Sequence, residues 1–167
     1  MNQSQLLQME TTGLSYKEEL MSYKNYSSYT ARFIQLTLSS DHTITGTSAS
    51  TVQFDTIAGD SGHGVSISSN LITLSADRHY WGFGAVAIDR DSGTDTHFTE
   101  FYNSSNVELT ESSGYFSSVL PGDTNFDSRV IQLSVSPTST TSFYIKSRGA
   151  AGDIQSDNTH LILIEMS

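Results

Sequence analysis

The sequence predicts an all-β, antiparallel jelly-roll sandwich preceded by a short, partly helical segment. From residue 30 onward, apolar side chains recur with period two in short runs. Polar turns rich in Ser, Gly and Asn separate these runs, and no helical period follows residue 30. Hydroxyl residues replace charged ones: the chain has 29 Ser and 19 Thr. Only 16% of residues are charged, against about 25% in a typical soluble domain.

The chain has the length of one ordinary domain, at 167 residues. Its composition changes near residue 30, and no linker to a second domain follows. We therefore expect an N-terminal docking segment, residues 1–29, and one jelly-roll domain, residues 30–167.

The N-terminal segment contains the single predicted helix. Ser15 and Glu18 fit a capping box, which predicts a helix over residues 16–24. A helix this short is not stable alone in water, so it must pack on its own domain or on another protein. In the second case the side chains expected to dock are Leu6, Leu7, Leu14, Leu20 and Met21.

The first half of the β-domain contains five short runs. Residues 31–38 alternate as a strand, and shorter strands are expected at 43–46 and 52–56. Residues 64–68 and 71–74 are predicted to pair as a hairpin, because Ser and Asn between them favour a tight turn.

The second half of the β-domain continues the pattern. Residues 97–103 and 107–111 are predicted to form a hairpin around a small polar turn. Residues 129–136 keep their aliphatic side chains on one face, and a proline ends the strand. Strands at 141–148 and 159–166 complete the set.

Two strands are apolar on both faces, which is unusual for a sheet with one face in water. Residues 78–89 alternate Tyr80 with Trp81 and Phe83, and residues 161–164 are apolar throughout. Such strands are either covered within the subunit or lie at an interface, and a chain with few helices favours the interface. The residues assigned to this interface are Trp81, Phe83, Tyr144, Leu161, Ile162, Leu163 and Ile164.

Charge and composition exclude several classes. The formal net charge is -10 with only 8 Lys and Arg residues, so we expect no nucleic-acid partner. The absence of Cys excludes disulfides and thiolate metal sites. No apolar run approaches the ~20 residues of a membrane span, and residues 1–5 lack secretory-leader features. We therefore expect neither a membrane partner nor a leader.

Asp89, Asp91 and Asp95 are the candidate metal ligands, because clustered carboxylates suit calcium. Their spacing departs from the EF-hand pattern, and a solvated hairpin loop explains them better. We therefore expect no cofactor, with calcium as the alternative. Residues 59–62 match the nucleophile segment of trypsin-like proteases, but the upstream His and Asp context is missing. We expect no catalytic residues.

The β-domain resembles the trimeric jelly roll of the C1q and tumour-necrosis-factor (TNF) families over residues 31–166. An apolar strand leads through a turn into a Tyr- and Phe-rich strand, and an apolar strand ends the domain. The segments that carry the resemblance are residues 52–55, 61–65, 71–83, 129–135, 141–148 and 158–164. The resemblance implies a homotrimer.

The same jelly roll occurs in bacteriophage virion proteins, which this chain resembles in being acidic, cysteine-free and rich in Ser, Thr and Gly. We therefore expect a non-enzymatic virion protein that decorates a capsid or tips a short fibre, with capsid or tail proteins as partners. A receptor- or carbohydrate-binding fibre or spike head is the alternative. A secreted C1q-like ligand and a jelly-roll hydrolase are more distant rivals.

Overall fold

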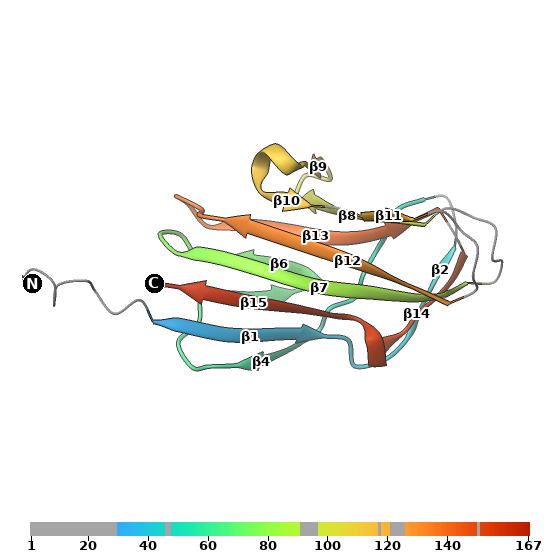
Figure 1. The fold of residues 1–167 in the computed structure, drawn as a ribbon, viewed down its shortest axis with the longest axis horizontal. Coiled ribbons are helices and arrows are strands. Elements are labelled where there is room, and N and C mark those ends of the chain that lie inside the picture. The colour runs from blue at the N-terminus through green and yellow to red at the C-terminus, as the bar shows by residue number, and fades with distance from the viewer. Residues whose placement is uncertain (1–29, 46–47, 91–96, 117, 121–125, 150) are drawn as a thin grey trace, which may run out of the picture.

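The computed structural model describes residues 30–45, 48–90, 97–116, 118–120, 126–149 and 151–167 (Figure 1). In these residues the chain forms antiparallel strands and two single 3-10 turns, η1 (Glu111–Ser113) and η2 (Ser156–Asn158). No helix in the described part is long and apolar enough to cross a membrane. The predicted docking segment and its helix lie outside the described residues.

The first sheet, sheet A, has the strand order β10-β12-β7-β15-β1-β4, with β14 and β2 extending from the far end of β7. The long central strand β7 pairs with β12 on one side and β15 on the other. The bounds are β1 Ala31–Thr37, β2 His42–Thr45, β4 Thr56–Gly59, β7 His79–Arg90, β10 Tyr115–Phe116, β12 Phe126–Val135, β14 Ala151–Ile154 and β15 His160–Met166.

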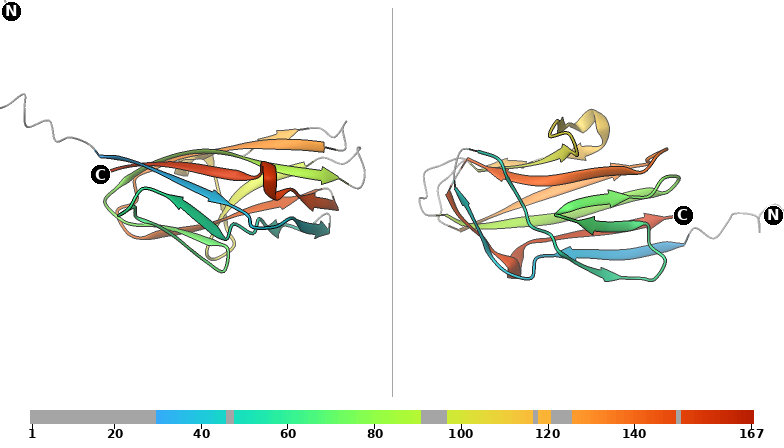
Figure 2. Two further views of the ribbon diagram at one scale, coloured as in Figure 1. Left: turned by 90° about the horizontal axis from the view of Figure 1, so that it is seen from below. Right: turned by 180° about the vertical axis from the view of Figure 1, so that it is seen from behind.

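The second sheet, sheet B, has the order β11-β8-β13-β6-β5, with β3 on β13 and β9 on β8. Figure 2 shows the two sheets as facing layers. The bounds are β3 Ser50–Thr51, β5 Val65–Ser68, β6 Leu71–Leu74, β8 His97–Asn103, β9 Glu108–Leu109, β11 Ser118–Leu120 and β13 Thr141–Arg148.

The core lies between the sheets and is built mainly from alternate residues of the longer strands, with Leu38, Val52 and Phe54 added from the connections. Tyr80 and Phe54 are among its largest fully buried side chains. At one edge, Phe101, Tyr115 and Phe143 form a ring cluster with centroids 5.1 to 5.6 Å apart. Such tilted aromatic contacts add to the stabilisation that burial provides.

The predicted jelly-roll fold is confirmed, and both predicted hairpins are present. Ser69 and Asn70 join β5 to β6 with φ values of 50° and 64°, which Asn tolerates well. In the β8–β9 turn, the Asn103 side chain accepts hydrogen bonds from the N–H groups of Ser105 and Val107. The turn residues Ser69, Asn70 and Asn103 therefore fix the pairing register of the β5–β6 and β8–β9 hairpins.

The strand predicted at residues 52–56 is shifted to β4, Thr56–Gly59. Val52 and Phe54 are buried, which produces the alternation. However, the Val52 N–H donates to the Ile145 carbonyl of β13 in sheet B, and only residues 56–59 pair with β1 in sheet A. The apolar alternation over residues 52–56 therefore predicted the buried residues correctly but placed the strand too early in the sequence.

Candidate subunit interface

Strand register brings the apolar residues of sheet A into rows across its outer face. One row runs Phe33, Ile164, Trp81, because β1 pairs with β15 and β15 with β7. In the next row, Ile162 pairs with Phe83, Phe83 with Gln132, and Gln132 with Phe116. Residues from five separate strands therefore meet on one surface.

This surface, called here the apolar face, consists of Phe33, Trp81, Phe83, Phe116, Val130, Ile162 and Ile164. Its five most exposed members are large: Phe33 is 57% exposed, Trp81 52%, Phe83 40%, Phe116 42% and Val130 57%. The Trp81 and Phe83 rings lie 6.2 Å apart. A contiguous apolar patch of this kind on a single subunit marks an interaction site.

Neutral polar residues lie among the members of the apolar face. Gln35, Gln132 and Ser134 share its rows, and each is exposed. A notch of about 290 Å³ opens beside Phe33 and Ile162, with Ala58 on its far side. The face therefore offers both protruding rings and a recess.

The structure places four of the predicted interface residues on the apolar face: Trp81, Phe83, Ile162 and Ile164. Leu161 and Leu163 are corrected, because strand alternation turns both into the core, where they are fully buried. Tyr144 is also corrected, because it belongs to β13 in the opposite sheet.

Three members of the apolar face were not among the predicted interface residues: Phe33, Phe116 and Val130. Phe33 and Val130 are out of phase with the aliphatic side chains of their own strands, which point inward. The signal available in the sequence was therefore an apolar residue at a strand position that alternation assigns to the solvent-facing side. Phe116 lies in a strand of two residues, too short for any periodicity.

A buried ion cluster closes the end of the sandwich where β15 finishes. Glu165 follows Leu163 on the inward face and is fully buried. Its carboxylate accepts hydrogen bonds from Arg32 at 3.0 Å, from Arg78, and from the Gly64 N–H. Burial alone would raise the pKa of the Glu165 carboxyl, but the Gly64 N–H and the two guanidinium groups outweigh burial and hold that pKa below its usual range.

The candidate metal ligands do not form a site in the part of the chain that the structure describes. Asp89 is exposed on β7 opposite Asp153, while Asp91 and Asp95 lie outside the described residues. No group of three carboxylate or imidazole side chains gathers among the residues described.

The protease-like segment at residues 59–62 has a structural role. The Asp60 carboxylate accepts from the Phe33 N–H at 3.0 Å, and the Gly62 carbonyl accepts from Arg78. These bonds close the loop against β1 and the ion cluster. The predicted docking residues, Leu6, Leu7, Leu14, Leu20 and Met21, lie outside the described residues.

No protein-family model matches the sequence, and no curated protein is significantly similar to it. Solved structures do match. Murine APRIL at pH 8.0 has a TM-score of 0.59 at 11% identity, covering 81% of this chain and 98% of that chain. Eiger TNF from S. frugiperda has a TM-score of 0.54 at 9% identity, covering 83% and 93%. The fold is a TNF-like jelly roll.

A third solved structure, the PRD1 vertex protein P5, matches at a TM-score of 0.47 and 11% identity, covering 82% of this chain and 95% of that chain. This match is too loose to carry an argument. The TNF-like jelly roll is established by the two closer structures, and identities this low establish the fold alone.

Proposed function

We propose that this protein is a non-enzymatic structural protein that assembles as a homotrimer through the apolar face of sheet A. The observation that carries the proposal is the set of large side chains exposed on that face. Fully burying one side chain of the size of Phe stabilises an interface by about 1.5–3 kcal/mol. Several such residues together offset the loss of translational and rotational freedom on association.

Three-fold symmetry suits the shape of this face. In a closed three-membered ring, one patch of each subunit contacts a different patch of the next. The apolar face has two such halves: the protruding rings of Trp81 and Phe83, and the notch beside Phe33 and Ile162. The trimeric C1q and TNF jelly rolls that the sequence resembles support the same stoichiometry.

Light scattering of the full chain tests the trimer. We expect a mass near three chains for the wild-type protein and near one chain for a Trp81→Ser, Phe83→Ser double variant. The matched control is Tyr102→Ser with Tyr144→Ser, which removes two rings from the outer face of sheet B and should leave the mass unchanged. A wild-type monomer, or a double variant that remains trimeric, would reject the proposed interface.

We further propose that the trimer is a virion component attached by residues 1–29 to a capsid or a short tail fibre. The support is the acidic, cysteine-free, hydroxyl-rich composition that resembles phage decoration and fibre proteins. It is consistent with this role that the described chain starts beside its own C-terminus: the Thr30 N–H donates to the Ser167 carbonyl. Three attachment segments would then leave a trimer from the same end.

Cosedimentation with purified virus particles tests the attachment. We expect the wild-type chain to sediment with particles stripped of it, and a variant with Leu6, Leu7, Leu14, Leu20 and Met21 all changed to Ser to stay in solution as a trimer. Equal binding of both proteins would rule out these residues as the attachment surface. The absence of the wild-type chain from purified particles would reject the virion role.

A further inference from the structure

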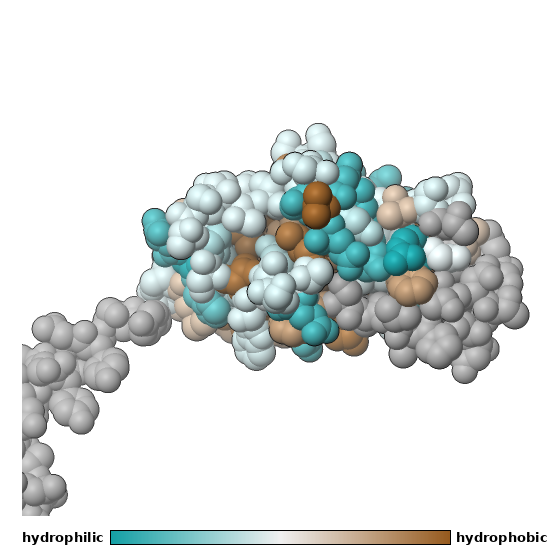
Figure 3. Space-filling view, turned by 90° about the horizontal axis from the view of Figure 1, so that it is seen from above, coloured by the Kyte–Doolittle hydropathy of each residue, from teal (hydrophilic) through white to brown (hydrophobic). Residues whose placement is uncertain are grey.

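A cavity of about 460 Å³ opens at the edge of the sandwich. It lies between η1, the end of β12 and the start of β13, and borders the apolar rows of sheet A at Ser134. Figure 3 views the edge that carries β9 and β10, and shows brown apolar side chains in a hollow among paler ones. Its volume falls within the range of about 300–1,000 Å³ that is usual for small-molecule sites.

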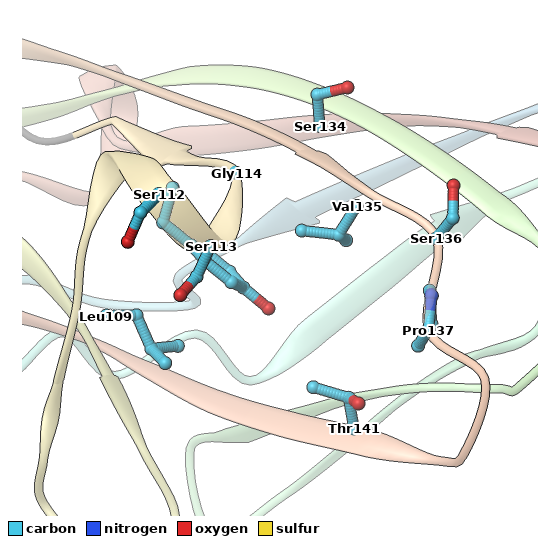
Figure 4. Close-up of a pocket in the computed structure, with 10 residues that line it drawn as sticks. Leu109, Ser112, Ser113, Gly114, Ser134, Val135, Ser136, Pro137 and Thr141 are labelled. Carbon is cyan, nitrogen blue, oxygen red and sulfur yellow. The ribbon is translucent and has the colours of Figure 1, made fainter.

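The lining of the cavity combines aliphatic and hydroxyl groups. Leu109 and Val135 provide apolar surface, and Ser113 and Thr141 stand near them (Figure 4). The hydroxyl groups of Ser134 and Ser136 point away from the cavity in the same view. None of the described residues that line the cavity is charged, so an ionic ligand would lose its hydration without gaining a counter-charge from them.

Tyr115 provides an independent sign that a ligand belongs here. Tyr115 lines the cavity and is 3% exposed, yet its buried hydroxyl has no hydrogen-bond partner among the residues that the structure describes. Burial raises the pKa of Tyr115 to about 12, so the phenol is a neutral donor at physiological pH. A buried polar group without a partner costs about 1–3 kcal/mol, and folded proteins rarely retain one without a reason.

The rim of the cavity requires a glycine, and its turn combines ordinary hydrogen bonds, such as Ser134 N–H to the Gly114 carbonyl at 2.8 Å, with one long one. Gly114 has φ 83°, and a Cβ at this position would lie 2.2 Å from the Ser134 carbonyl oxygen. The adjacent η1 turn has no side-chain cap, and the Tyr115 N–H reaches the Thr110 carbonyl at a long 3.4 Å. A small movement of this turn would give a bound molecule access to the shielded Tyr115 hydroxyl.

We infer that this cavity binds a small neutral polyhydroxylated molecule of monosaccharide size. The hydroxyl groups of such a ligand both donate and accept, so they can pair with the Tyr115 and Ser113 hydroxyls at once. Its C–H faces would pack on Leu109 and Val135. This inference does not depend on the trimer, because the cavity is built within one subunit.

Ligand-observed NMR on the full chain provides the test, with D-glucose, D-galactose and N-acetyl-D-glucosamine as neutral probes and D-glucuronic acid as the anionic one. We expect at least one neutral sugar to bind with Kd in the millimolar range, and the acid to bind more weakly. If none of the neutral sugars binds, or the acid binds best, the inference is wrong.

Two variants distinguish this cavity from binding elsewhere. Tyr115→Phe removes only the hydroxyl, so we expect binding to weaken about five- to tenfold while thermal stability stays equal or rises. Ser113→Phe, at an exposed rim position, should block binding without unfolding the domain. Tyr144→Phe, on the opposite sheet, is the matched control and should bind normally. Unchanged sugar binding in both Tyr115→Phe and Ser113→Phe would overturn the inference.

Discussion

At the scale of single residues, Glu165 shows how a buried charge is accommodated. Its carboxylate is fully buried but receives two guanidinium groups and a backbone N–H. Gly64 contributes a second hydrogen bond, because its carbonyl accepts from the Tyr80 hydroxyl at 3.1 Å. The cluster therefore joins β15, β1 and the loop before β7 into one network, and removing any member leaves the others uncompensated.

Changing Glu165→Gln should lower the free energy of unfolding at neutral pH by about 3 kcal/mol, because two guanidinium groups lose a buried partner. In the wild-type protein the carboxyl pKa is lower when folded than when unfolded. Its contribution is therefore complete above the unfolded value of about 4.3 and is lost as pH falls through the folded pKa. Urea denaturation across a pH series measures this.

The variant should accordingly lose less stability than the wild-type protein between pH 5 and strongly acidic conditions. Glu108→Gln, at an exposed position on β9, is the control and should follow the wild-type curve. If Glu165→Gln and wild type decline in parallel with falling pH, the buried carboxylate is not the acid-sensitive group.

At the scale of elements, β7 depends on two inward-facing glycines. A Cβ on Gly84 would lie 2.2 Å from the His160 carbonyl oxygen and 2.8 Å from the Leu161 Cα, both fixed backbone atoms. A Cβ on Gly82 would meet the Leu163 and Leu133 side chains at 2.6 and 3.0 Å. Side chains can rotate away, whereas a paired backbone cannot, so the two sites differ in tolerance.

Changing Gly84→Ala should therefore lower the free energy of unfolding by roughly 1–3 kcal/mol, the usual cost of overpacking. Gly82→Ala is the matched comparison and should cost less, because the clash falls on flexible leucine side chains. Guanidinium denaturation of both variants measures the difference. Equal losses, or a larger loss for Gly82→Ala, would contradict this account of strand packing.

The elements also show what the sequence could predict. Residues 78–89 were expected as a strand and β7 is His79–Arg90, because a long apolar alternation is strong evidence of a strand. β14 was missed, since Ala151–Ile154 holds one large apolar residue and is a strand only through its pairing with β2 and β7. Such pairing joins distant segments and leaves no local mark.

This dependence on distant segments also explains which interface residues could be predicted from the sequence. Trp81 and Phe83 were predicted because large rings alternated with a second apolar set. Nothing within residues 161–164 indicates which alternate residues face inward, because both sets are aliphatic. Only the opposing sheet decides, by burying Leu161 and Leu163. The sheet to which a strand belongs is likewise a long-range property, which is why Tyr144 was misplaced.

At the scale of the whole molecule, we propose that assembly depends on apolar contact and not on a metal ion. EDTA should leave the mass measured by light scattering unchanged, because the residues proposed to carry the contact are apolar side chains such as Trp81, Phe83 and Phe33. Addition of calcium to the EDTA-treated protein serves as the control. Dissociation in EDTA that calcium reverses would contradict this prediction and implicate Asp89, Asp91 and Asp95.

The hydrogen bond from Thr30 to Ser167 has a directional consequence. β7 starts opposite Met166 at this same end and extends twelve residues, to Arg90. At about 3.3 Å per residue, its far end is roughly 40 Å away. A three-fold assembly of this chain would have two different ends along its symmetry axis. If residues 1–29 attach the trimer as proposed, a tag fused after Ser167 would lie at the attached end, and the Arg90 end of β7 would lie at the opposite end.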